Sequence, residues 1–187
     1  MKRQKFLGTL LAAATMPLAG RAMHLGSGQR TDKGFKVPRG KGRLHGHITL
    51  KGINQNVLDV KVSGSDTNGS LAVFEQTSLS QGKGTPYHVH HNQDEMFYVV
   101  EGEYFFKVGT KEFELQAGDS IFLPMKVPHA WTQRSASGKM TVTFAPAGKM
   151  ESFFIALAAA HQPTPADIAK LFADNDMQIV GAPLPLK

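Results

Sequence analysis

The chain contains no cysteine among its 187 residues. This absence excludes disulfides, thiolate metal sites, cysteine nucleophiles and lipid attachment through an N-terminal cysteine. Any metal that the chain binds must therefore sit on nitrogen and oxygen ligands. The length is enough for one well-buried domain and too short for two ordinary ones, so we expect a single domain.

Long hydrophobic runs are also lacking. The apolar run at residues 6–18 is too short to span a bilayer, and it follows a positive head that contains Lys2, Arg3 and Lys5. This order predicts a signal peptide over residues 1–22 and an exported protein, periplasmic or secreted, with no stable membrane span in its mature form. The opening also resembles a twin-arginine export signal, except that Gln4 replaces the second arginine.

Acidic residues are scarce only in the first part of the chain. Residues 30–51 hold seven basic residues and one acidic residue, whereas residues 52–187 hold 10 basic and 14 acidic residues. The formal charge of +6 therefore reflects the leader and a Gly-rich segment, which we interpret as a flexible basic arm over residues 23–46. This distribution argues against a nucleic-acid partner.

Helical periodicity is absent from residue 47 to about residue 145. Short apolar or alternating runs are instead separated by turn residues at close spacing, which predicts an all-β antiparallel sandwich or barrel over residues 47–147. The expected strands are 47–50, 56–62, 70–78, 87–90, 95–100, 104–108, 111–115, 120–123, 129–133 and 140–145.

The character of the chain changes over residues 148–187. Residues 151–160 are rich in helix formers, and Thr164, Pro165 and Asp167 form a typical helix start. We expect two short helices that pack on the barrel, followed by an extended tail from Met177. Whether the helices only cover a sheet face stays open at this point.

The stretch from Pro86 to Gly102 concentrates the chemistry. Alternate residues of a strand share a face, so His88 and His90 project together, and Glu95 can fold back over the same face from the next strand. Such nitrogen and oxygen ligands suit one divalent transition metal, namely iron, manganese, nickel, copper or zinc. A fourth ligand is expected from elsewhere, and His129 is available.

These residues fit two spaced motifs. The first is Gly, five residues, His-x-His, four residues, Glu, six residues, Gly; it is met by Gly82, His88, His90, Glu95 and Gly102.

The second motif is Gly, five residues, Pro-x-Gly, two residues, His, three residues, Asn, and Gly118, Pro124 and His129 meet it. Lys126 and Gln133 depart from it, standing where glycine and asparagine are frequent. The paired motifs, over about residues 70–145, resemble those of the cupin superfamily. The C-terminal segment further resembles small single-domain quercetin-dioxygenase-like cupins.

The resemblance implies a double-stranded β-helix, or jelly-roll barrel, with a flexible N-terminal arm and two short C-terminal helices. It implies that His88, His90, Glu95 and His129 bind the metal. We expect an apolar substrate pocket whose walls share the faces of Glu95 and His129, lined by Phe97, Val99, Trp131 and Gln133. Four phenylalanines are further candidates, although periodicity does not separate pocket from core: Phe74, Phe106, Phe122 and Phe144.

The leading functional hypothesis is a metal-dependent, quercetinase-like dioxygenase for a small aromatic or enolic substrate, with Glu95 as both ligand and catalytic base. One alternative is a cupin that binds metal or a small molecule without catalysis. Another is non-oxidative, metal-assisted isomerisation, decarboxylation or hydrolysis. A homodimer is an expectation drawn from the family.

Overall fold

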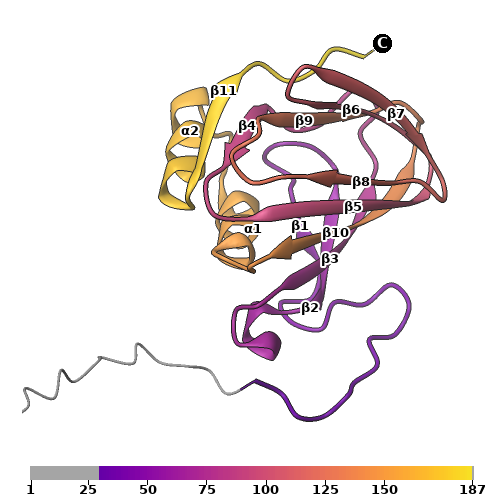
Figure 1. Ribbon diagram of the computed structural model, residues 1–187, viewed down its shortest axis with the longest axis vertical. Coiled ribbons are helices and arrows are strands. Elements are labelled where there is room, and N and C mark those ends of the chain that lie inside the picture. The colour runs from indigo at the N-terminus through magenta and orange to yellow at the C-terminus, as the bar shows by residue number, and fades with distance from the viewer. Residues whose placement is uncertain (1–29, 187) are drawn as a thin grey trace, which may run out of the picture.

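The computed structural model describes residues 30–186, in which two antiparallel sheets face each other as a barrel with two helices at one end (Figure 1). The expected signal peptide and the first part of the basic arm lie outside the described residues. Within residues 30–186, no helix combines the length and the apolar character needed to cross a membrane.

The strands divide into a six-stranded sheet A and a five-stranded sheet B. In spatial order, sheet A consists of β1 (Ile48–Thr49), β2 (Val57–Val62), β3 (Ala72–Ser78), β10 (Gly138–Ala145), β5 (Asp94–Glu101) and β8 (Ser120–Leu123). In spatial order, sheet B consists of β11 (Met177–Gly181), β4 (Tyr87–His90), β9 (His129–Gln133), β6 (Glu103–Val108) and β7 (Lys111–Gln116). This arrangement confirms the expected all-β jelly-roll.

Alternation of apolar and polar residues explains which sheet faces are buried. In β3, Ala72, Phe74, Gln76 and Ser78 are buried while the residues between them are half-buried. The inward side chains of both sheets form one core, which continues into the helices through Phe153. Gln76 is thus the one long polar side chain on the inner face of β3.

Two helices follow the barrel, α1 (Met150–Ala159) and α2 (Pro165–Asp174). Thr164 caps α2 as expected: its hydroxyl accepts a hydrogen bond from the Asp167 amide, and the Asp167 carboxylate accepts one from the Thr164 amide. At one end of the barrel, α2 packs against β11, while α1 packs against β1 and against α2 (Figure 1).

The expected extended tail is a β-strand over its first five residues. Met177 to Gly181 form β11, which pairs antiparallel with β4 so that Met177 lies opposite His90. The β4 edge would otherwise leave backbone amides and carbonyls unpaired, and the tail satisfies them. Residues 182–186 carry no regular secondary structure.

The described part of the basic arm, residues 30–46, contains no helix or strand. Several contacts nevertheless tie it to the short 3-10 helix η1 (Gly64–Thr67) and to β2. Arg43 donates from Nε to the Asp66 carboxylate over 2.9 Å, its amide donates to the Val60 carbonyl over 2.7 Å, and its guanidinium lies 4.0 Å from the Phe35 ring centroid. The flexibility of the whole arm stays a prediction.

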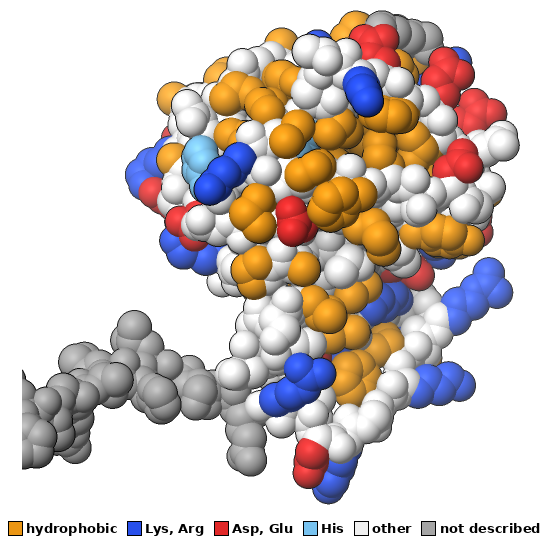
Figure 2. Space-filling model, viewed as in Figure 1, with side chains coloured by type: hydrophobic (Ala, Val, Ile, Leu, Met, Phe, Trp, Pro, Cys, Tyr) orange, Lys and Arg blue, Asp and Glu red, His pale blue; other side chains and the backbone are white. Residues whose placement is uncertain are grey.

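Apolar side chains also gather on the outer face of sheet A, over β5 and β8 (Figure 2). Met96 and Tyr98 are 45% and 44% exposed, and Phe122, opposite Met96, is 57% exposed. Phe122 was a candidate for the pocket, and its outward position on the edge strand removes it from that role. The homodimer stays a prediction.

Candidate metal centre

Three strands bring the four expected ligands together. His88 and His90 lie on β4, His129 begins β9, and Glu95 lies on β5 of the facing sheet. His88 and His129 are directly opposite each other in the β4–β9 ladder. The alternation that places His88 and His90 on one face therefore also aims them across the barrel at Glu95.

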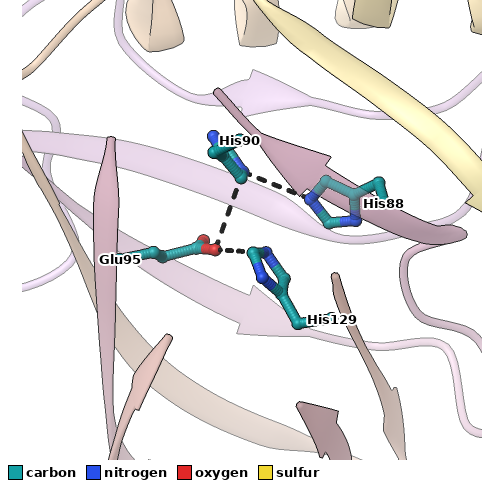
Figure 3. A group of neighbouring side chains, drawn as sticks. All are labelled: His88, His90, Glu95 and His129. Atoms are coloured by element: carbon teal, nitrogen blue, oxygen red, sulfur yellow. Dashed lines mark hydrogen bonds and ion pairs between the residues drawn. The ribbon is translucent and has the colours of Figure 1, made fainter. Parts of the chain in front are cut away.

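All four side chains are buried, and one possible ligand atom from each lies within 4.8 Å of the others (Figure 3). His88 Nε2 and His90 Nε2 are 3.2 Å apart, and Glu95 Oε2 is 3.1 Å from His129 Nε2 and 3.7 Å from His90 Nε2. The ring nitrogens and the carboxylate thus point at one small volume.

The outer ring nitrogens fix the tautomers of two histidines. His88 Nδ1 lies 2.8 Å from the Pro86 carbonyl, and His129 Nδ1 lies 3.0 Å from the Val127 carbonyl. A carbonyl only accepts, so in both rings Nδ1 carries the proton and donates it. The Nε2 lone pair then faces the centre, as a metal ligand requires.

Gln93 takes the corresponding position beside His90. It is 1% exposed, and within residues 30–186 both its Oε1 and His90 Nδ1 lack a hydrogen-bond partner that meets strict geometry. Burial lowers the pKa of His90 to about 4, while the Gln93 side chain acts in the opposite direction, as an acceptor for the ring would. Gly148, whose φ is 52°, provides space for the Gln93 side chain, because a Cβ at residue 148 would collide with the Gln93 side-chain amide.

Burial also sets the charge states of the other ligands. Loss of solvation lowers the pKa of His88 to about 3 and that of His129 to about 4, so at neutral pH the imidazoles are neutral. The same cause raises the pKa of Glu95 to about 7. Without a cation the carboxylate is therefore costly in this position.

Residues 76–145 match the family model of the cupin domain. This match covers both strands of the β4–β9 pair and Glu95. Over this segment the chain is therefore similar to cupin domains. The likeness agrees with the paired motifs that contain His88, His90, Glu95 and His129.

An uncharacterized protein of Methanocaldococcus jannaschii is 35% identical to this chain over 48 residues, which are 26% of the present chain and 38% of that protein. Among solved structures, an RmlC-like cupin from Shewanella frigidimarina is 26% identical with a TM-score of 0.44, over 51% of this chain and 80% of the other. A predicted oxalate decarboxylase from Thermotoga maritima is 17% identical with a TM-score of 0.47, over 50% and 82%.

The site fits a metal ion on its own geometry. Glu95 Oε2 and His129 Nε2 are fully buried and find no hydrogen-bond partner in the described part of the chain, although unpaired buried polar atoms are costly. A cation between them would satisfy both. Ligand atoms that surround one ion at about 2.1 Å lie at most about 4.2 Å apart, so the spread of 4.8 Å requires only a small contraction.

The turn between β8 and β9 accommodates Lys126 at the position where the second motif has glycine. Lys126 adopts a φ of 64°, the left-handed region in which glycine is favoured, and its amide donates to the His90 carbonyl over 2.8 Å. The loop that leads from β8 to β9 is therefore tied to the end of β4. Asp94, the first residue of β5, also contacts this turn: its carboxylate accepts a hydrogen bond from the Met125 amide.

A cavity of about 50 Å³ opens onto the ligands. Phe97 and Trp131 line it as expected, and so does Phe144. Val99 and Gln133 do not line it. Val99 packs in the core, and the Gln133 amide is used up in hydrogen bonds to the backbone of Ser78, Ser80 and Ser135.

Sequence reasoning missed the contribution of the helices to this cavity. Met150 and Phe153 of α1 and Phe172 of α2 line it, and the Phe172 ring centroid lies 5.2 Å from that of His88. The apolar stripes of the helices predicted that they are buried, but not what they bury against. The aromatic residues at Phe153 and Phe172 were the available signal.

Proposed function

We propose that this chain is a metal-dependent, quercetinase-like dioxygenase that acts on a small aromatic or enolic substrate. The observation that supports it is the convergence of three neutral imidazoles and one carboxylate on a cavity whose other walls are largely apolar and contain several aromatic rings. Such a site holds a divalent transition metal and favours a flat, largely apolar ligand with an oxygen that reaches the centre.

The chain's own residues supply three things to that reaction. Phe97, Trp131 and Phe172 orient the ring of the substrate and exclude water. Glu95 Oε2 accepts the proton of the substrate hydroxyl. A bound redox-active metal would supply the Lewis acidity and the electronic coupling to dioxygen.

The first test is elemental analysis of the purified protein beside two variants. His90→Ala removes a buried ligand, while His91→Ala removes the exposed neighbouring imidazole and serves as the matched control. We expect about one iron, manganese, nickel or copper per chain in wild type and in His91→Ala, and loss of that metal in His90→Ala. Full metal content in a folded His90→Ala protein contradicts the ligand assignment.

Oxygen uptake with flavonols and catechols then tests the chemistry. Uptake that depends on the metal and is lost in His90→Ala supports the dioxygenase. Ligand binding without uptake shifts the function to a non-catalytic binding protein, and turnover with zinc and without oxygen shifts it to isomerisation, decarboxylation or hydrolysis. The proposal includes export, which fractionation of cells expressing the chain with and without residues 1–22 would test.

A further inference from the structure

A second cavity lies between the helices and the barrel. It has a volume of about 120 Å³ and is lined by Leu50 and Asn56 from the β1–β2 region, Leu157 of α1 and Ile168 of α2, among others. We call it the helix-capped chamber. Its lining is strongly apolar, and side chains of α1 and α2 form its roof.

The helix-capped chamber adjoins the metal cavity. Gln76, Trp131, Phe153 and Phe172 belong to the walls of both. The two spaces are therefore separated by no more than single side chains, most of them aromatic rings. A ligand that extends past those rings would reach from the chamber to the metal ligands.

Size decides how the two spaces would be used. A buried water needs roughly 10–15 Å³ of such volume, so the 50 Å³ beside the ligands accommodates a few waters or one oxygen-bearing group. An engineered apolar cavity in another protein that binds benzene measures about 150 Å³. The metal cavity is much smaller than that, whereas the chamber approaches it. An aromatic ring therefore has room only if it uses the chamber.

One polar group in the shared wall is already oriented. Gln76 Nε2 donates to Ser78 Oγ over 2.8 Å, and Ser78 Oγ also accepts from the Tyr104 hydroxyl over 2.9 Å. These bonds fix the amide so that Oε1 is the free end, and no donor from residues 30–186 is bonded to it. A fixed, sheltered acceptor in an apolar wall selects a ligand with a hydroxyl donor.

We propose that the helix-capped chamber binds the apolar ring of a phenolic substrate, with one oxygen at the metal centre and a ring hydroxyl donating to Gln76 Oε1. This assignment rests on the proposed function, which it deepens by naming the substrate class and the residues that select it. The substrate is a monocyclic phenol or catechol with a small apolar substituent, since the chamber accepts about one ring.

Binding can be measured without turnover. Trp131 is the only tryptophan of the chain and lines both cavities, so its fluorescence reports on their occupancy directly. We would titrate the zinc-loaded protein, without oxygen, with 4-methylcatechol. Zinc has no redox chemistry, so the affinity is obtained whether or not the protein is an oxygenase.

Two variants fill the chamber, and a third is the matched control. Leu157→Phe and Ile168→Phe add volume to its roof, whereas Ile155→Phe adds the same volume to α1 at a position that is 39% exposed. Ile168 is half-buried, so its variant keeps the test valid if Leu157→Phe does not fold. We expect the dissociation constant to rise at least tenfold in the filling variants and less than twofold in the control, with one zinc per chain throughout.

Gln76→Leu tests the polar contact. We expect it to weaken the binding of 4-methylcatechol about tenfold and to leave the binding of toluene, which has no hydroxyl, unchanged.

The proposal is overturned if 4-methylcatechol does not bind, or if it binds the folded Ile168→Phe protein as tightly as it binds wild type. Oxygen uptake in the protein loaded with a redox metal is scored separately. If 4-methylcatechol binds in the chamber but no oxygen is consumed, only the dioxygenase proposal is refuted. If oxygen is consumed and Ile168→Phe does not change the rate, only the chamber proposal is refuted.

Discussion

Replacing Glu95 with glutamine should change how the stability of the metal-free protein depends on pH. Burial raises the pKa of Glu95 to about 7 from an ordinary value of 4.5. A group whose pKa is higher in the folded state than in the unfolded state contributes stability that is fully present below the unfolded value. That contribution is lost as the pH rises through the folded value.

The size of the effect follows from the same two values. They differ by about two and a half pH units, and each unit corresponds to about 1.4 kcal/mol, so ionisation of Glu95 costs the metal-free protein about 3 kcal/mol. Glutamine has nearly the same shape and does not ionise. The free energy of unfolding of wild type minus that of Glu95→Gln should therefore fall by about 3 kcal/mol between pH 4.5 and pH 8.

Urea unfolding of both proteins after removal of metal, followed through Trp131 fluorescence from pH 4.5 to pH 8, measures this difference. His91→Ala is the control, because its exposed ring lies outside the cavity and its curve should run parallel to that of wild type. Parallel curves for wild type and Glu95→Gln would refute the reasoning. Saturating zinc should reverse the trend, since a cation favours the ionised carboxylate and the difference then grows with pH.

Two further substitutions test the surroundings of the ligands. Gln93→Leu should lower zinc affinity 10- to 100-fold in a competition assay with a chelator, because the buried His90 ring loses the polar side chain beside it; unchanged affinity would show that Gln93 does not position the ring. Lys126→Gly should raise the free energy of unfolding by about 1 kcal/mol in urea, because Lys126 adopts a left-handed φ of 64° that glycine adopts without strain. A loss of stability there would mean that the lysine side chain contributes more than its backbone costs.

The strands that contain the site could be predicted closely, because prolines and turn residues in the sequence mark where these strands begin and end. β4, β8 and β9 have the expected limits, set by Pro86, by the turn before Ser120 and by Pro128. Alternation within β4 was enough to place His88 and His90 on one face, and two separate motifs supplied Glu95 and His129. Local pattern and ligand chemistry thus agreed on the same four residues, which the structure brings together.

The parts that failed depend on packing between segments far apart in the chain. Phe97 and Val99 share a strand face, yet only Phe97 reaches the cavity, because the helices open space at one end of the barrel and the core fills the other. Gln133 shares the face of Trp131, but its amide pairs with the backbone instead. Periodicity gives the face of a strand and not the position of the cavity along it.

The C-terminal segment is the clearest case, because its contribution to the site arises from a single long-range pairing. β4 contacts β9 directly at His88 and His129, and its opposite edge is completed by β11, which places Ile179 opposite His88 and Met177 opposite His90. The same pairing anchors α2, because only a short connection separates the end of α2 at Asp174 from the start of β11 at Met177. The tail therefore holds the strand that carries two ligands while α2 sets Phe172 against His88, so the segment after the barrel is part of the metal site.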